Sequence, residues 1–206
     1  MTTAGDIIYG GTSGTGTRLG VGTNGQVLTL ASGLPSWAAA SGGSTTHTIG
    51  EIYGGGRVFY VYDGGLHGLI GATTDQSTSM RWFGGTSTNT RARADGVGAG
   101  LKNTAIIIAN QGPVDGNAFA ATVCNEYSIT VSGVTYGDWY LPSRHELNLL
   151  YLQRAQFTGG AAFGNNVYWS SSEDFNTNAG DQSFSNGLQF STNKSNSGHV
   201  RAVRAF

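Results

Sequence analysis

The sequence is poor in several features that common protein classes depend on. It holds one cysteine, Cys124, and three prolines in 206 residues, and only 11% of its residues are charged. A single cysteine excludes an internal disulfide framework, and so few prolines argue against a disordered, proline-rich chain. No apolar run approaches the ~20 residues of a membrane span, so we expect no insertion into a membrane.

The charges that are present nearly cancel. There are 11 lysines and arginines and 12 aspartates and glutamates, which gives a formal net charge of −1. Nucleic acids and anionic membranes bind clusters of basic residues, and the sequence has no such run. We therefore expect neither as a partner. The first ten residues carry neither a basic leader nor an apolar signal core, so we expect no export by a standard signal.

Glycine is the abundant residue. The 34 glycines are more than twice the average share of ~7%, and they follow no three-residue period, which excludes a collagen helix. Hydrophobic residues make up 38% of the chain and aromatic residues 11%, which is enough for a core. This composition predicts a folded protein rich in loops and β-structure with a neutral, polar surface.

A change of composition near residue 45 predicts two parts. Residues 1–45 alternate short apolar runs with Gly, Thr, Ser and Asn, and have too few apolar residues for a core of their own. Three copies wrapped about one axis would bury them, so we expect an extended, β-rich stalk and a homotrimer. The segments GDIIYGG, RLGVGTNGQVLTL and LPSWA resemble a module of phage tail-fibre and tail-tip proteins. That resemblance implies other tail-fibre or baseplate proteins as partners.

Residues 46–206 predict a compact α+β domain. Strands are indicated on both sides of a turn at Asp63-Gly64-Gly65, in YWSSSE, and on both sides of a turn at Asn186-Gly187. A last strand, HVRAVRAF, cannot keep its apolar residues on one face, so we expect a bulge or burial on both sides.

Three helices are also expected. The segments GLKNTAIIIANQG and NAFAATVCNEY have helical spacing or composition. The clearest signal is LPSRHELNLLYLQ, in which Ser143 and Glu146 form the S-x-x-E capping box of a helix start. Core positions are predicted for Trp82, Trp139 and Trp169, which lie among apolar or turn-forming neighbours.

Several motifs in order carry a second resemblance, over residues 50–206. YGDWYLPSRHELNLLY, YWSSSE, the NG turn and VRAVRAF resemble a bacterial and phage domain family that includes the C-terminal domain of the Legionella collagen-like adhesin. The resemblance implies a C-type-lectin-like fold of the formylglycine-generating-enzyme-like variant, trimers and binding of a surface ligand. The sequence departs from these relatives in two ways. It has no collagen-like region, and Gly180 stands where relatives often carry Trp, which predicts a gap in the local packing.

The C-terminal tract further resembles the variable proteins of diversity-generating retroelements, in which a reverse transcriptase randomises the adenines of Asn codons. Such changes never produce Lys, Glu, Gln, Trp or Met, and between residues 174 and 199 only Gln182, Gln189 and Lys194 lie outside the reachable set. The competing interpretation is a surface loop of ordinary composition. The resemblance implies the following ligand-binding residues: Asp174, Phe175, Asn176, Thr177, Asn178, Asp181, Ser183, Ser185, Leu188, Phe190, Ser191, Thr192, Asn193, Ser195, Asn196, Ser197, Gly198 and His199.

Within this tract we expect a separation of roles. Aromatic anchors dominate many interfaces, so Phe175 and Phe190 should contribute most to affinity, with asparagines adding hydrogen bonds. The alternative places Phe190 in the core of the hairpin. The backbone would be held by other residues, namely Tyr168, Trp169, Phe184, Val200 and Val203.

Motifs of catalysis are incomplete. Residues 20–25 match GxGxxG, but no helix follows, so we expect a turn. His145-Glu146 lacks the second histidine of a zinc protease, and the lone Cys124 lies in an apolar helix. A serine nucleophile needs a general base nearby, and the sequence spacing indicates none for Ser170, Ser171 or Ser172. A calcium site would need more carboxylates than Glu173, Asp174 and Asp181 supply. We expect no catalytic residue, metal or cofactor.

The sequence as a whole predicts a host-attachment protein. We expect a receptor-binding tip of a phage or prophage tail fibre, located on the virion, acting outside the cell on a host cell-surface protein or glycan. One alternative is a bacterial surface adhesin with the same binding domain. The alternative of another class is an enzyme of the formylglycine-generating type, which the missing second cysteine and metal cluster disfavour.

Overall fold

The computed structural model describes residues 3–11, 14–40, 45–112 and 115–206. The chain divides into two compact units, Met1–Thr45 and Thr46–Phe206, which we call the N-terminal segment and the head.

The N-terminal segment consists of two antiparallel hairpins. β1 (Ile7–Gly10) pairs with β2 (Gly16–Leu19), and β3 (Gln26–Ala31) pairs with β4 (Leu34–Ala39). Residues 20–25 connect β2 to β3 as a loop with no helix after it, as predicted. Large apolar side chains stay exposed within one chain, among them Ile8, Val21, Leu28 and Leu30. Isolated hairpins of this kind are at best marginally stable in water.

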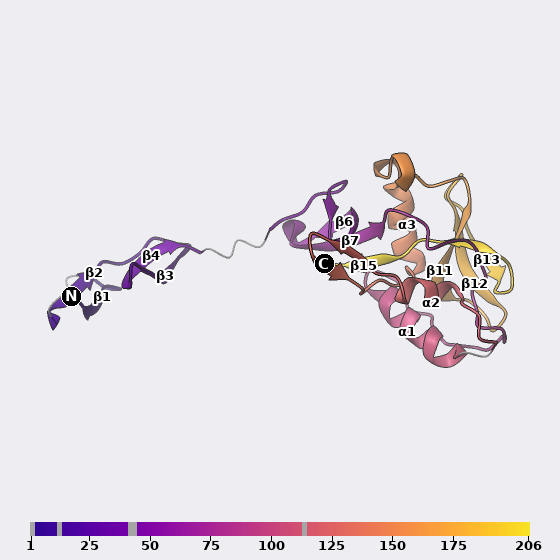
Figure 1. Ribbon diagram of the computed structural model, residues 1–206, viewed down its shortest axis with the longest axis horizontal. Helices are drawn as coiled ribbons and strands as arrows, with labels where there is room; N and C mark the ends of the chain where they lie inside the picture. The colour runs from indigo at the N-terminus through magenta and orange to yellow at the C-terminus, as the bar shows by residue number, and fades with distance from the viewer. Residues whose placement is uncertain (1–2, 12–13, 41–44, 113–114) are drawn as a thin grey trace. The chain divides into compact units, whose positions relative to one another are not determined.

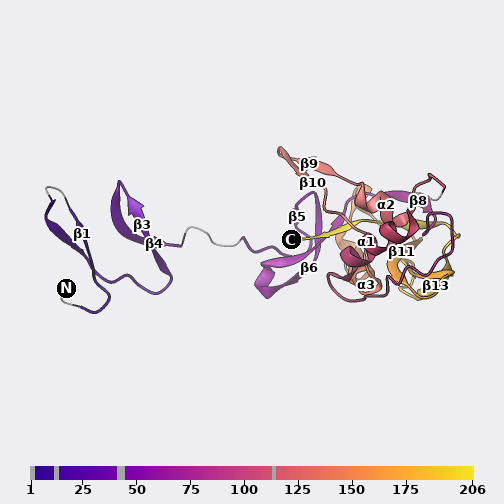
Figure 2. The same cartoon turned by 90° about the horizontal axis from the view of Figure 1, so that it is seen from below.

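Two sheets build the head (Figure 1), and a short hairpin lies outside them (Figure 2). The four-stranded sheet has the order β15-β7-β6-β5, and the five-stranded sheet has the order β13-β12-β11-β14-β8. The strands of the first sheet are β5 (Ile52–Tyr53), β6 (Gly56–Tyr62), β7 (His67–Ala72) and β15 (Val203–Ala205). Those of the second are β8 (Ser77–Met80), β11 (Val167–Glu173), β12 (Asn178–Ser183), β13 (Gln189–Asn193) and β14 (Gly198–Val200). The hairpin is β9 (Ile129–Val131) with β10 (Val134–Tyr136).

The predicted turns of the head are confirmed. β6 and β7 are joined by a 3-10 turn at Asp63–Gly65 in which all three residues have positive φ. β12 and β13 form the predicted hairpin, and Gly187 in its turn has a φ of 82°.

All three predicted helices are present. They are α1 (Ala99–Gln111), α2 (Ala120–Asn125) and α3 (Arg144–Leu152), with further 3-10 turns at Arg154–Gln156 and Gly159–Ala161. The capping box at the start of α3 is confirmed. The N–H of Glu146 donates to Ser143 Oγ at 3.2 Å, and the N–H of Ser143 donates to Glu146 Oε2 at 2.8 Å. The head is therefore an α+β domain, as expected.

The terminal strand is divided in two. β14 pairs with β8 and β11, whereas β15 pairs with β7, so the chain passes from one sheet to the other at Arg201-Ala202. Both residues are buried, which confirms the expected burial on both sides. The Arg201 guanidinium is satisfied inside the protein, because its Nε donates to Asp75 Oδ1 at 2.5 Å and its NH1 donates to two backbone carbonyls.

The core holds the predicted tryptophans. Trp82, Trp139 and Trp169 are at most 1% exposed, and each indole N–H donates to a backbone carbonyl. Cys124 is also fully buried, and burial raises the pKa of its thiol far above the ordinary value. The tryptophans therefore fill the interior and do not form a ligand platform.

We predict that Trp169→Ala lowers the free energy of unfolding by about 3–5 kcal/mol, because it empties a fully buried site. The matched control is Phe175→Ala, which removes an aromatic ring that is 63% exposed and should change stability by only ~0.5 kcal/mol. Urea unfolding of both variants is the measurement. Equal midpoints for the two variants would show that Trp169 is not part of the core.

Candidate functional site

The predicted ligand-binding tract runs from the end of β11 through β12 and β13 into β14 (Figure 1). Most of its predicted residues are exposed or half-buried. The exposed ones are Phe175, Asn176, Thr177, Ser185, Leu188, Phe190, Ser191, Asn193, Ser195, Asn196 and Ser197. The half-buried ones are Asp174, Asn178, Thr192 and His199. The structure thus gathers the tract on neighbouring strands and turns of one sheet.

Three predicted residues do not point outward. Asp181 and Ser183 are 3% and 8% exposed, because β12 lies between β11 and β13. Gly198 is also buried, and a Cβ there would lie 2.8 Å from Nε1 of Trp169, which leaves no room for a side chain. Asp181, Ser183 and Gly198 are therefore not on the surface that a ligand would meet, contrary to the expectation from the sequence.

Three large apolar residues of the tract are left in solvent. Phe175 is 63% exposed, Leu188 is 56% exposed and Phe190 is 47% exposed. The alternative that placed Phe190 in the core is therefore wrong. Phe175 lies in the turn between β11 and β12, while Leu188 and Phe190 are two residues apart along the hairpin and so lie on one face.

The polar side chains around these residues hold the turns. Thr177 Oγ1 donates to Asn178 Oδ1 at 2.8 Å, and Asn178 Nδ2 donates to the carbonyl of Ser191 at 3.1 Å. Asn193 Oδ1 accepts from both the N–H and the hydroxyl of Ser195. The side-chain amides of Asn178 and Asn193 therefore stabilise the turns and remain at least partly exposed to solvent.

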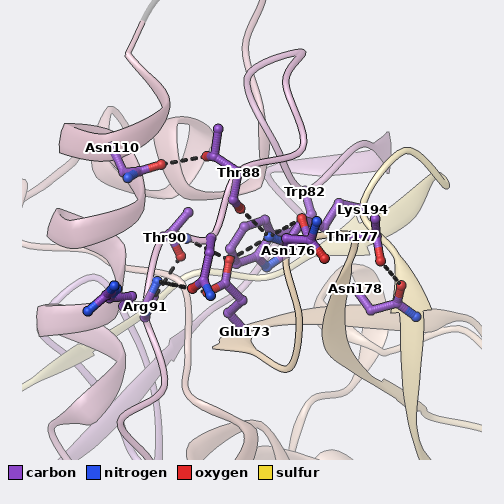
Figure 3. A network of polar contacts seen from close by, with 12 residues as sticks. Trp82, Thr88, Thr90, Arg91, Asn110, Glu173, Asn176, Thr177, Asn178 and Lys194 are labelled. Atoms are coloured by element: carbon purple, nitrogen blue, oxygen red, sulfur yellow. Dashed lines mark hydrogen bonds and ion pairs between the residues drawn. The ribbon is translucent and has the colours of Figure 1, made fainter.

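Beneath the tract lies a buried ion pair between Lys194 and Glu173 (Figure 3). Both side chains are 0% exposed, and Lys194 Nζ donates to Glu173 Oε1 at 2.5 Å. The same ammonium donates to the carbonyls of Thr88 at 3.0 Å and Asn176 at 2.9 Å, so all three of its N–H groups are used. Nζ also lies 4.6 Å from the ring centroid of Trp82.

The carboxylate of this pair is equally satisfied. Glu173 Oε1 accepts from the N–H of Thr90 at 2.8 Å, and Oε2 accepts from the N–H of Arg91 at 2.7 Å. Burial alone would raise the pKa of Glu173, but the hydrogen bonds from Lys194, Thr90 and Arg91 outweigh it and lower the pKa. Glu173 therefore remains charged at neutral pH, and the pair joins the loop at residues 88–91 to the tract.

Arg144, the first residue of α3, supports the tract from another side. Its NH2 donates to Asp174 Oδ2 at 2.7 Å and to the carbonyl of Phe190 at 3.2 Å. A Cβ at Gly180 would lie 2.6 Å from Arg144 Nε, so the guanidinium occupies the space beside this glycine. The gap in packing that the sequence predicted at Gly180 is therefore not found.

The two glutamines of the tract also bind the frame. Gln182 is fully buried, and its Nε2 donates to Asn148 Oδ1 on α3 at 2.9 Å and to the carbonyl of Gly187 at 3.0 Å. Gln189 Nε2 donates to the carbonyl of Arg144 at 2.9 Å. Sequence reasoning gave no role to Gln182, Gln189 or Lys194, although the codon argument set these three residues apart.

The residues considered for catalysis have structural partners. Glu146 is fully buried and accepts hydrogen bonds from the Tyr140 hydroxyl and from the backbone of Gly98 and Gly100, while His145 beside it is exposed. The serines that follow Trp169 are buried, and Ser170 Oγ donates to the carbonyl of Gly180. Among the described residues, no group of three or more His, Cys, Asp and Glu side chains could hold a metal ion.

Pockets lie elsewhere on the head. One, of ~470 Å³, is lined by residues of α1, α2 and the loop between them, including Ile108, Phe119 and Glu126. Another of ~390 Å³ lies between the β5–β6 and β9–β10 hairpins, and one of ~360 Å³ lies beside Asp75 and Glu126. The residues of the tract are absent from the lining of these three pockets. No helix in the described part of the chain is long and apolar enough to cross a membrane.

The head is thus an α+β domain whose hairpin exposes aromatic and amide side chains, a surface of the kind found at interaction sites. A family model for the Lcl C-terminal domain matches residues 71–204. Since this match covers more than half of the chain, the chain belongs to the Lcl C-terminal domain family, which confirms the resemblance seen in its motifs. Membership supports an adhesin-like or receptor-binding module. No curated protein matched the chain.

We predict that Lys194→Met lowers the free energy of unfolding by about 3–5 kcal/mol, because it leaves Glu173 charged and unpaired in the interior. Adding Glu173→Gln to this variant should recover part of the loss. Lys102→Met, which removes an exposed lysine of α1, is the control and should stay within ~0.5 kcal/mol of the wild type in urea unfolding. Equal stabilities of the Lys194 and Lys102 variants would contradict a structural role for the pair.

Proposed function

We propose that this protein is the receptor-binding tip of a phage or prophage tail fibre, and that the tract at residues 174–199 binds a ligand on the host cell surface. The observation that carries the proposal is the exposure of Phe175 on a turn, and of Leu188 and Phe190 on the adjoining hairpin. Polar contacts from Lys194 and Arg144 hold both in place. Exposed large apolar residues grouped on a folded surface are typical of interaction sites.

The physical case rests on a rigid frame with adaptable contacts. Aromatic side chains supply contact area at low entropic cost, and Asn and Ser supply hydrogen bonds in many orientations, as in antibody loops. The tract offers both kinds of residue, with Asn176, Asn193 and Asn196 exposed near the aromatic side chains in the sequence. A protein or a glycan on the cell surface would serve as the ligand of such a site.

We also propose that a retroelement diversifies this tract. The three residues that Asn-codon mutagenesis cannot produce, Gln182, Gln189 and Lys194, all have side chains that bind the frame, and the reachable residues Asp174 and His199 also contact Arg144 and Asp75. Most of the reachable residues between 174 and 199 are exposed or half-buried. A diversified surface needs such a division, because its variable side chains must not be required for folding.

The position of the tract within the head agrees with a role at a tip. His47, one of the first residues of the head, stacks on Tyr53 with ring centroids 3.7 Å apart and meets the C-terminal Phe206 edge-on. Strand β13 lies at the opposite end of the head from the C-terminus in both views (Figures 1 and 2). The candidate surface is therefore remote from the point where the chain enters the head.

For the N-terminal segment we propose a homotrimeric stalk that joins other tail-fibre or baseplate proteins. Its two hairpins leave Ile8, Leu28 and Leu30 between 50% and 71% exposed, and neighbouring copies about a common axis would cover them. The resemblance of residues 1–40 to tail-fibre modules favours this location over the surface of a bacterium. A bacterial adhesin with the same head is the second candidate, since the family match supports it equally.

An enzyme of the formylglycine-generating type is less well supported, and we propose a binding function without catalysis. Cys124 is fully buried in α2, and burial raises the pKa of its thiol, so it offers no accessible thiolate.

We predict that exchanging tract residues for others reachable from Asn codons changes binding and leaves folding intact. Phe175→Ser and Phe190→Ser should each shift stability by only ~0.5 kcal/mol but weaken binding by ~2 kcal/mol, about 30-fold. Binding of the labelled full chain to a panel of bacterial strains, together with melting curves, is the measurement. Leu101→Ser removes an apolar residue of α1 that is 55% exposed and serves as the control. Loss of folding in both phenylalanine variants, or binding as strong as that of the control, would rule out this site.

We predict that the full chain has the mass of three 21.4 kDa chains in light scattering and that a chain without residues 1–45 has a smaller assembly mass. The reason is that the apolar side chains of the N-terminal segment need neighbouring copies to be buried. A monomeric full chain, with no change of state on deletion, would contradict the stalk.

A further inference from the structure

Strand β13 forms one edge of the five-stranded sheet, and β8 forms the other. The chain that continues from β8 is covered by α2, because the N–H of Ala120 donates to the carbonyl of Arg81 at 3.0 Å. β13 pairs with β12 on one side, and in the described part of the chain no strand pairs with its other side.

Two hydrogen bonds fix which backbone groups of β13 point outward. The N–H of Ser183 donates to the carbonyl of Leu188, and the N–H of Lys194 donates to the carbonyl of Thr177, each at 2.9 Å. Backbone groups in an antiparallel pair alternate between facing the partner strand and facing away. With this register, Phe190 and Thr192 direct their N–H and C=O groups to β12. Gln189 and Ser191 therefore direct theirs away from the sheet.

Only one of the outward-facing backbone groups of Gln189 and Ser191 has a hydrogen-bond partner among the described residues. The carbonyl of Ser191 accepts from Asn178 Nδ2. The N–H groups of Gln189 and Ser191 and the carbonyl of Gln189 lie along the edge and take no part in the pairing with β12. Natural sheets usually protect such an edge with Lys, Pro or a bulge. The β13 sequence QFSTN contains no Lys or Pro, and its pairing with β12 has no bulge.

We propose that the ligand contains an extended peptide segment that pairs with β13 as an added strand. This inference rests on the proposed function and specifies its ligand as a protein, because backbone N–H and C=O groups spaced along a strand are matched by another backbone. Side chains on one face of the added strand would contact Phe190 and Leu188, so we expect apolar residues there at a spacing of two. The other face would lie beside Gln189 and Ser191 and would be polar.

Strand addition is well suited to a surface whose side chains vary. Hydrogen bonds made by the backbone of residues 189 and 191 are independent of the side chain at 190 or 191. Exchanges at these positions would therefore change which peptide is preferred and would keep the geometry by which any peptide is held.

The decisive comparison is Ser191→Pro against Ser191→Thr. Proline removes the outward N–H and obstructs an incoming strand, yet costs no bond to β12, and it is tolerated where the N–H of an edge strand faces solvent. Threonine alters the side chain but keeps the N–H. The probe is a displayed library of short linear peptides selected on the immobilised full chain. We expect the selected peptides to bind the threonine variant like the wild type and the proline variant about tenfold more weakly or worse, at unchanged melting temperature.

Hydrogen exchange on the wild type provides a readout that does not depend on the folding of a variant. Bound peptide should slow exchange of the Gln189 and Ser191 amides, which are otherwise open to solvent. If no linear peptide is selected, if the proline variant binds as well as the wild type, or if these amides exchange at the same rate with peptide bound, strand addition is wrong. Continued sensitivity of cell binding to Phe175→Ser and Phe190→Ser would then leave the proposed site standing with a different mode of contact.

Discussion

Lys194 and Glu173 form an ion pair inside the head on which the shape of the whole candidate surface depends. The pair is held by contacts from three places: the loop at residues 88–91, the end of β11 and the turn after it. Two buried charges are stable only when nearly every hydrogen-bonding group is matched, and here the ammonium and both carboxylate oxygens have partners. This requirement favours one arrangement of the turn that carries Phe175. It also holds Arg91 at a φ of 63°, which a bulky residue rarely adopts, because the Arg91 N–H must reach Glu173 Oε2.

A second cation, the partly exposed Arg144, acts on the other aromatic residue. Arg144 joins the start of α3 to Asp174 and to the carbonyl of Phe190, and it fits there because residue 180 is glycine. The positions of Phe175 and Phe190 thus depend on the buried ion pair and on the partly buried Arg144 guanidinium. Preorganisation of this kind lowers the entropic cost of binding and lets exposed residues change without loss of the fold. Whether a tract residue supports the fold or faces solvent depends on its burial and not on its place in the sequence, since supporting and exposed residues alternate along the tract.

Local chemistry was sufficient to predict much of the frame from the sequence. The capping box at Ser143, the Asp63-Gly64-Gly65 turn and the buried tryptophans each depend on interactions between near neighbours or on hydrophobicity. Burial within the tract could not be predicted in the same way, because it depends on β12 lying between two other strands. Asp181 and Ser183 are buried for this reason, and Gly198 is buried because β14 lies between β11 and β8, with Trp169 against it. The partners of Lys194 come from segments up to 106 residues away in the sequence, and the only signal of its importance was its codon class.

An unpaired edge strand can pair with the same strand of another molecule, and this risk constrains which residues the tract can contain. The same backbone groups that would accept a ligand strand could pair with another copy of β13, and exposed phenylalanine next to them would strengthen that pairing. The face of β13 opposite Phe190 is nevertheless rich in amide and hydroxyl side chains, namely Gln189, Ser191 and Asn193. Such side chains can occupy backbone groups of the edge, as Asn178 of the neighbouring strand β12 does at the carbonyl of Ser191. For the proposed strand addition, the Asn and Ser side chains would therefore also keep the edge of β13 from pairing with a second copy of itself.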